Sequence, residues 1–369
     1  MLFIHVFSNA YTLRSYGKYT IFVRFLKISY FIMRRLVDYI KDWMLPIAII
    51  TGISAFLVYY FTPSLAPLGP LFHRIAADGQ RLLIGVLLFF QFVKASPHDM
   101  GLRRWHLYVL LFQCLTFVGL AVLAAFMERN GLRIMVECAM LCLMCPTASA
   151  AGVITDKLGG RIAETVTYLV IVNAVATLVI PTVIPLVHPS SDMGFWRYVL
   201  AIAWKIFPLL ICPCILAWII RYTMPKLQRA LMRFSPKSFY IWGVCLALAM
   251  VLSTRALITS FPGVWTLWGI VAVTVLCCAV QFKLGRVFGR AAEKAVASGE
   301  PEEASSLEGV SPTAITAGQA LGQKNTGFLI WLGYTYMTPV TSIAGGLYAI
   351  FQNIFNSWEL YQKKSSKNQ

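Results

Sequence analysis

The chain has 369 residues, of which 58% belong to the apolar set AVILMFWYC and only 13% are charged, yet its formal net charge is +17. These values exclude a disordered chain and argue against a soluble domain, in which about half of the residues are apolar and about a quarter are charged. A bilayer-spanning helix needs roughly 20 mostly apolar residues, so a chain with many spans would have room only for short connections and for no large soluble catalytic domain.

The first 43 residues differ from the rest of the chain. Residues 1–32 mix Ser, Tyr, Lys and Arg with apolar residues, and they lack the long apolar stretch and the small-residue cleavage site of a signal peptide. Met33 then begins MRRLVDYIKDWMLP, a short basic amphipathic segment that resembles the ordinary N-terminal start of a protein chain. We predict an N-terminal extension over 1–43, in which 1–32 is either an upstream extension or a loosely membrane-associated tail.

Ten apolar runs follow, each bounded by charge, Gly or Pro. They predict helices over 44–61, 79–95, 105–127, 133–157, 162–187, 195–220, 238–259, 264–289, 313–337 and 338–358. If the N-terminus is cytoplasmic, 24 of the 32 Lys and Arg residues lie in cytoplasmic segments and six lie in outer loops, with Lys205 and Lys324 inside spans. This bias follows the positive-inside rule and predicts ten spans in the cell (inner) membrane, with both termini in the cytoplasm.

The sequence lacks the residue patterns that other classes of function require. The basic excess is not gathered on a soluble surface of the kind that binds nucleic acid. All nine cysteines lie in apolar runs, without the Cys and His spacing of a zinc site, and the five histidines have no i, i+4 pairing. We therefore expect no enzyme, no metal site and no cofactor other than a sodium ion or proton as coupling ion.

Two of the apolar runs are interrupted. The fourth contains CPTASAAGVITDKLGG from Cys145 to Gly160, where Pro146 removes a backbone hydrogen bond and clashes with the preceding turn. The ninth contains GQALGQKNTG from Gly318 to Gly327, where amides and a lysine lie at bilayer depth. Because hydrocarbon offers no hydrogen bonds, protein or a water-filled cavity must satisfy the freed backbone groups.

The interruptions fall at corresponding places in two halves. The first half covers 44–187, and the second covers 195–358 and includes an acidic loop at 290–311; a basic tail follows at 359–369. Five spans is an odd number, so the second half must insert upside down, as in the inverted repeats of secondary transporters. The predicted fold is an all-α integral membrane protein with ten transmembrane helices in two inverted five-helix repeats, in which broken helices 4 and 9 cross. Proline kinks that serve packing alone are the alternative.

The residues around both interruptions resemble the bile acid:sodium symporter family. The resemblance rests on Cys145-Pro146, on Asn325 and the glycines that flank it, and on PVTSIAGGLYAIFQNIFNSW from Pro339. The resemblance covers the chain from about Asp42 to Trp358, and the chain resembles a divergent, bacterial-type member of the family. It implies a panel of spans 1, 2, 6 and 7 against a core of spans 3 to 5 and 8 to 10, and the transport of an organic anion together with sodium.

The family's sodium ligands carry over only in part. The resemblance assigns an ion ligand to Gln113 and a hydroxyl to Thr165, whereas Ala151, Gly152, Leu169 and Ala320 stand where the family has side-chain oxygens, and Lys324 stands at a family glutamine. A fixed ammonium at an ion site repels a second cation. We therefore hypothesise that Lys324 replaces a bound sodium, with Glu164 or Asp156 as its counter-charge. The alternatives are that Lys324 reaches an aqueous edge and that both acids cap helices.

The candidate site set combines the hydroxyl, amide and charged side chains of spans 3, 4, 5 and 9. Its members are Gln113, Thr147, Ser149, Thr155, Glu164, Thr165, Gln323, Lys324, Asn325 and Thr326. The predicted function is alternating-access transport of a small organic anion, with the lipid bilayer as the other partner. A sensor or partner subunit that keeps the fold without transport, and an auxin-efflux-type carrier, are the alternatives; substrate identity and oligomeric state stay open.

Overall fold

The computed structural model describes residues 43–295 and 310–366, so most of the N-terminal extension, the middle of the acidic loop and the last three residues lie outside the described residues. Within the described part, all regular elements are helical apart from one isolated bridge. The α-helices are α2 (Met44–Phe61), α3 (Gly69–Lys94), α4 (Arg104–Phe126), α5 (Gly131–Met144), α6 (Ala151–Leu158), α7 (Ile162–Val187), α8 (Phe195–Leu210), α9 (Cys212–Thr223), α10 (Pro225–Phe234), α11 (Ser238–Thr259), α12 (Val264–Lys294), α13 (Pro312–Gly322), α14 (Thr326–Tyr336) and α15 (Ser342–Ser366). Short 3₁₀ turns cover Pro63–Leu68, Pro97–Asp99, Ser235–Lys237 and Pro339–Thr341.

Seven helical segments of the described chain are long and apolar enough to cross a membrane. They are Met44–Phe61, Pro63–Lys94, Arg104–Phe126, Ile162–Val187, Phe195–Thr223, Pro225–Thr259 and Val264–Lys294. The chain is therefore an α-helical protein of the membrane-embedded type. The other three predicted spans correspond to the interrupted pairs α5–α6 and α13–α14, whose halves are short, and to α15, which carries several polar side chains.

The helices differ from the sequence prediction in several places. Helix α3 begins at Gly69, ten residues before the predicted start, because Asp78 and its neighbouring arginines continue the helix beyond the apolar run. The sixth predicted span is divided at Ile211, between Pro208 and Pro213, each of which removes a backbone donor. An additional helix, α10, forms in the basic loop before α11, with no buried residue of its own.

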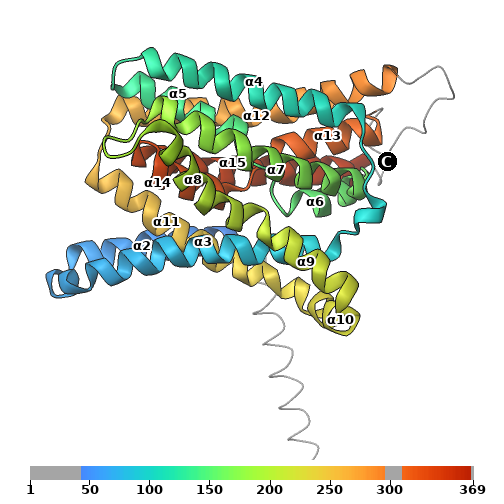
Figure 1. The fold of residues 1–369 in the computed structure, drawn as a ribbon, viewed down its shortest axis with the longest axis horizontal. Coiled ribbons are helices and arrows are strands. Elements are labelled where there is room, and N and C mark those ends of the chain that lie inside the picture. The colour runs from blue at the N-terminus through green and yellow to red at the C-terminus, as the bar shows by residue number, and fades with distance from the viewer. Residues whose placement is uncertain (1–42, 296–309, 367–369) are drawn as a thin grey trace, which may run out of the picture.

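The helices form two groups. Helix α11 packs along α2 and α3, and α3 packs along α8 and α9. Helices α2, α3 and α9 lie along the lower side of Figure 1, whereas α8 rises from α9 into the middle of the bundle and contacts α7. In the upper group, α12 contacts α4, α5, α13 and α15, while α7 contacts α4, α6 and α13. Helices α14 and α15 contact α11 and so join the two groups.

Helices α12 and α13 approach unusually closely. A Cβ atom added to Gly285 would lie 2.4 Å from the carbonyl oxygen of Ala317, and one added to Gly289 would lie 2.7 Å from Cα of Ala314. The two glycines are four residues apart, which is the spacing that lets helix backbones meet in membranes. This contact fixes the position of α13 and of the interruption that follows it.

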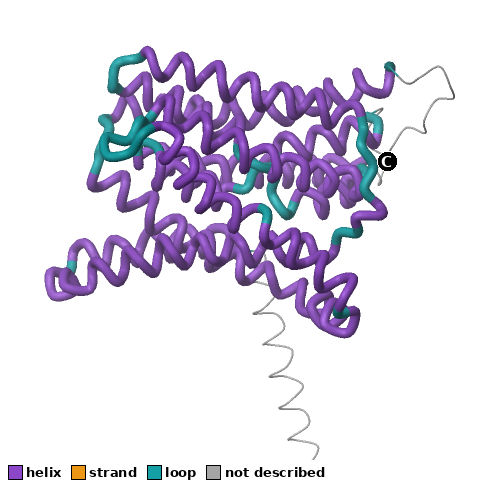
Figure 2. Tube along the Cα trace, in the orientation of Figure 1, coloured by secondary structure: helices purple, strands orange, loops and turns teal. Residues whose placement is uncertain are grey.

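Connections that the sequence assigns to one side of the membrane lie at one end of the bundle. Arg104 Nη1 donates to the carbonyl of Ala295 at 2.8 Å, which joins the start of α4 to the end of α12. At the opposite end, Arg133 Nη2 donates to the carbonyl of Val187 at 2.6 Å, which joins α5 to the end of α7. Figure 2 shows loops at these two ends, and it also shows short non-helical stretches in the middle of the bundle.

Candidate functional site at the helix crossing

The two helix interruptions meet each other. Residues 145–150 separate α5 from α6, residues 323–325 separate α13 from α14, and an antiparallel bridge joins Thr147 to Lys324. The amide of Ala148 donates to the carbonyl of Gln323 at 3.0 Å, and the amide of Asn325 donates to the carbonyl of Pro146 at 2.8 Å. We call these two stretches the helix crossing. Each stretch satisfies backbone groups that the other has freed from its helix.

Side chains reinforce the helix crossing. The Thr147 hydroxyl donates to the carbonyl of Ala320 at 2.6 Å, and the Cys145 thiol donates to the carbonyl of Asn325 at 3.1 Å. The Asn325 side chain accepts from the amide of Phe328 at 3.2 Å and so caps α14. The crossing is therefore held from both interruptions, by side chains as well as by backbone.

Lys324 lies at the centre of the crossing and is fully buried. Its Nζ donates to the carbonyl of Leu143 at 3.3 Å, in the last turn of α5. Gln113 Nε2 donates to the same carbonyl at 2.7 Å, and the Gln113 side-chain oxygen accepts from Tyr168. A helix C-terminus carries partial negative charge and free carbonyls, which attract a cation. The ammonium thus occupies a position that suits a positive ion.

The charged partners predicted for Lys324 lie elsewhere. The thiols of Cys142, Cys145, Cys277 and Cys278 interact with it electrostatically, and within the described residues no carboxylate pairs with it. Glu164 instead pairs with Arg103 and Arg161, both at 3.1 Å, and Asp156 is exposed. The expectation that either acid is the counter-charge is therefore corrected, because tertiary contacts supply Glu164 with two arginines and Asp156 lies on the exposed side of α6.

The structure divides the predicted site residues into two places. At the crossing lie Gln113, Thr147, Ser149, Gln323, Lys324, Asn325 and Thr326. The remaining three lie where α6 ends and α7 begins. There the hydroxyl of Thr165 donates to that of Thr155 at 3.3 Å, and Glu164 accepts from the indole of Trp105 at 2.9 Å. These three stabilise the α6–α7 connection rather than the crossing.

Several residues at the crossing are not among the site residues predicted from the sequence. Gln352 in α15 binds both backbone groups of Lys324, accepting from its amide at 2.8 Å and donating to its carbonyl at 3.4 Å. The Tyr348 hydroxyl donates to the carbonyl of Gly322 at 2.8 Å and receives a hydrogen bond from Gln281. Glutamines inside apolar runs were the available signal, because a buried amide requires partners.

A buried chain of polar groups leads from the crossing toward the end of α15. Gln323 donates to Gln319, Gln319 donates to Glu359 at 2.6 Å, and the fully buried Glu359 pairs with Arg286 of α12. This chain connects α12, α13 and α15 behind Lys324. It also gives the Glu359 carboxylate its charge partner, since a buried carboxylate without one is costly.

A second buried charge cluster lies at the opposite end. Glu137 of α5 is fully buried and pairs with Arg133 at 3.1 Å and with His188 at 3.0 Å. The carboxylate also accepts from the amide of Thr338 at 3.4 Å. The residues before α8 and before α15 therefore fold over Glu137 and close it off from the surface.

No protein-family model matches the chain, and a search of curated proteins finds no match.

Proposed function

We propose that this chain is a secondary transporter that moves a small organic anion across the membrane by alternating access, and that the Lys324 ammonium takes the place of a coupling sodium ion. The observation that carries the proposal is the fully buried Lys324 at the meeting of two interrupted helices, with its Nζ 3.3 Å from a carbonyl of the α5 C-terminus. Discontinuous helices that meet near the membrane midplane form the substrate and ion sites of secondary transporters.

The proposal takes the chain to have ten spans in two inverted repeats. The pairs α5–α6 and α13–α14 count as the fourth and ninth spans, and α15 as the tenth. Support comes from the matched place of the interruptions and from the connections, which alternate between the two ends of the bundle in Figure 1. Helices α2, α3, α8–α9 and α11 would be the panel, and the others would move against it.

Replacement of sodium follows from the ligands present. Ala151, Gly152 and Ala320 bring no side-chain oxygen to the crossing, whereas the Leu143 carbonyl there accepts from Lys324 and from Gln113. An ammonium and a sodium ion suit the same carbonyl, but they cannot occupy neighbouring positions without strong repulsion. Wild-type transport is therefore expected to proceed without sodium.

An anionic substrate suits the same place. Helix α14 begins at Thr326, two residues after Lys324, and a helix N-terminus attracts anions through its free amides. From α3, Gln80 donates to the carbonyl of Gly327 at 2.9 Å, while its buried Oε1 has no hydrogen-bond partner among the described residues. That oxygen is available to a substrate hydroxyl or a water. A small hydroxylated carboxylate fits these groups.

The test uses the full chain in proteoliposomes, with taurocholate and a set of small mono- and dicarboxylates under separate sodium and proton gradients. We expect uptake by the wild type to be unchanged when choline replaces sodium. Lys324→Gln, which introduces the amide that the resembled family carries there, should lower uptake at least about tenfold, the effect of about 1.4 kcal/mol. Any remaining uptake should be stimulated by sodium.

Lys283→Gln, which removes an exposed lysine of α12, is the matched control. Strict sodium dependence of the wild type would contradict the replacement.

The missing sodium ligands also favour a second candidate, a membrane sensor that keeps the transporter fold. A sensor would bind an anion without moving it. Saturable binding of a carboxylate to the purified protein, without flux into vesicles of the same preparation, would select this candidate over transport.

A further inference from the structure

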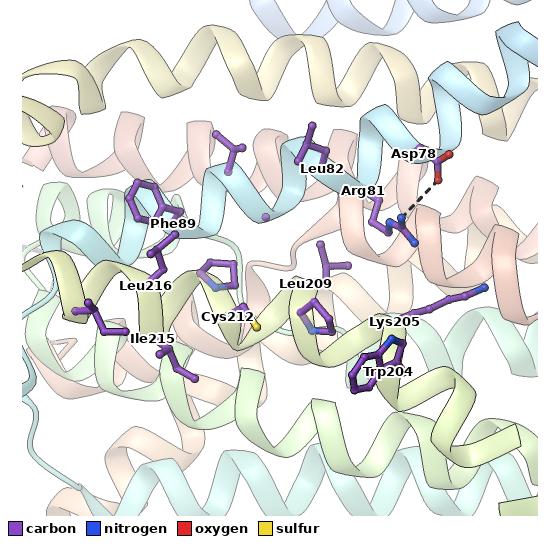
Figure 3. A pocket seen from close by; sticks show the side chains of 15 residues that line it. Asp78, Arg81, Leu82, Phe89, Trp204, Lys205, Leu209, Cys212, Ile215 and Leu216 are labelled. Atoms are coloured by element: carbon purple, nitrogen blue, oxygen red, sulfur yellow. Dashed lines mark ion pairs between the residues drawn. The ribbon is translucent and has the colours of Figure 1, made fainter. Parts of the chain in front are cut away.

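An apolar groove runs between α3 and α8–α9. It encloses about 960 Å³, and its walls include Leu82 and Phe89 of α3 and Leu209 and Leu216 of α8–α9 (Figure 3). We call it the α3/α8 groove. The helix crossing lies elsewhere: the buried face of α3, with Gln80 and its contact to α14, is turned the other way.

The α3/α8 groove opens to the outside of the molecule. Successive helix residues are about 100° apart around the axis, so Leu82 and Phe89 lie opposite Gln80 and Ile84. The exposed fractions of Leu82, Trp204 and Leu216 are 68%, 81% and 51%. In a membrane-embedded chain such apolar exposure faces lipid. The groove is therefore accessible to a molecule that lies in the bilayer.

One end of the groove is positively charged. Figure 3 places Asp78, Arg81, Trp204 and Lys205 at one end, and Phe89, Ile215 and Leu216 toward the other. The single Asp78 carboxylate lies 3.6 Å from Arg81 and 3.7 Å from Arg74, so it is shared between two arginines. The Lys205 ammonium lies 5.9 Å from the ring centroid of Tyr336, and within the described residues no carboxylate pairs with it.

The groove also has the length of a lipid chain. Lys205 and Ile219 both line it, and the fourteen residue steps between them span roughly 21 Å at about 1.5 Å per residue. One leaflet of the hydrocarbon core is roughly 15 Å thick. The exposed indole of Trp204 beside Lys205 is typical of the headgroup level. A ligand with an anionic head and an apolar tail matches this arrangement.

We propose that the α3/α8 groove binds an anionic phospholipid of the surrounding bilayer. The phosphate lies between Arg81 and Lys205, and one acyl chain lies along Leu82, Phe89 and Leu216. The lipid binds to the panel helices and is not the transported anion. The test of this site therefore does not depend on whether the chain transports anions.

The test measures the melting temperature of the purified full chain in detergent during titration with dioleoylphosphatidylglycerol or dioleoylphosphatidylcholine. The anionic lipid should stabilise the wild type at lower concentration than the neutral lipid. Removing both cations, in Arg81→Gln/Lys205→Gln, should weaken the response to the anionic lipid by about thirtyfold, because each basic residue near anionic headgroups contributes about fivefold. Arg129→Gln/Arg197→Gln removes two exposed arginines from the same end, outside the groove, and should respond as the wild type does.

A second variant tests the tail. A Cβ on Gly85 would lie 3.9 Å from Cδ1 of Leu209, so Gly85→Leu enters the groove without meeting backbone. It should abolish the response to both lipids and leave the lipid-free melting temperature unchanged. Equal responses to the two headgroups, a wild-type response of the double variant, or saturation by oleate alone would overturn the proposal. So would a dimer, detected by light scattering, that dissociates in Gly85→Leu, because a second copy would then fill the groove.

Discussion

The buried charges of this chain are stabilised in two different ways. Glu137 is neutralised by Arg133, whose guanidinium lies 3.1 Å from its carboxylate, and it also contacts the His188 ring at 3.0 Å. Within the described residues no carboxylate pairs with Lys324, and its ammonium donates to a carbonyl at the C-terminus of α5, whose partial negative charge takes the role of a counter-ion. This difference is why Lys324, rather than Glu137, is the residue proposed for function.

Loss of the Glu137 charge should destabilise the fold. Glu137→Gln leaves Arg133 buried and unpaired, and breaking one partner of a buried ion pair costs about 3–5 kcal/mol. The double variant Arg133→Met/Glu137→Met should be less destabilised, because neither charge remains. Unfolding in detergent measures both variants. Glu128→Gln, at an exposed position between α4 and α5, is the control, and a single variant no less stable than the double variant would contradict the ion-pair account.

At the scale of elements, the position of the crossing depends on how closely α12 and α13 pack. Gly285 and Gly289 let the backbone of α13 approach α12, and the Gln319–Glu359–Arg286 contacts hold the same helices at their polar side. A displaced α13 would carry Gln323 and Lys324 with it. Helix packing therefore sets the geometry of the candidate site from outside it.

A side chain at Gly285 should separate these helices. Gly285→Leu places a Cβ 2.4 Å from a backbone carbonyl, which cannot yield as a flexible side chain does. Overpacking of this kind costs about 1–3 kcal/mol or more, so the melting temperature in detergent should fall and uptake should be lost. Gly119→Leu, in α4 with no neighbour within 4 Å of its Cβ, should leave both unchanged. Equal losses in the two variants would refute the close-packing argument.

At the scale of the whole molecule, the two ends of the bundle should face opposite sides of the membrane. Lys226 in α10 lies at one end, while Glu128 and Ser191 lie in connections at the other, and all three are exposed. In a Cys212→Ser background, Lys226→Cys should react with an impermeant thiol reagent from one side only, and Glu128→Cys and Ser191→Cys from the other. Labelling after solubilisation is the control. Reaction of all three from one side would exclude the ten-span topology.

Alternating access requires α14 to move relative to α3. His73 of α3 and Tyr334 of α14 lie 3.0 Å apart between Nε2 and the hydroxyl. A short thiol crosslink in His73→Cys/Tyr334→Cys, again with Cys212→Ser, should lower uptake at least about tenfold, and reduction should restore it.

A matched crosslink joins helices of the same group. Tyr59 and Phe72, from α2 and α3, stack with ring centroids 5.0 Å apart. Tyr59→Cys/Phe72→Cys should retain uptake when crosslinked, because α2 and α3 are proposed to move together. Undiminished uptake with α3 linked to α14 would contradict a relative movement of the two groups.

The sequence by itself determined where the helices lie and where two of them are interrupted. Apolar run length, Pro146 and the amides after Gly322 act within a few residues, so local chemistry fixes these features. It also singled out Lys324, since a lysine in an apolar run is visible without a structure. Helix α10 and the early start of α3 were missed because charged residues that form helices carry no apolar signal.

Only the tertiary structure decided which residues meet. Lys324 and its partner carbonyl are 181 residues apart, and Gln352 reaches Lys324 from another helix. The same folding paired Glu164 with arginines instead of Lys324, buried Glu137, and joined α3 to α8–α9 in a groove. Local periodicity carries no information on such contacts, because they depend on how helices distant in sequence pack together.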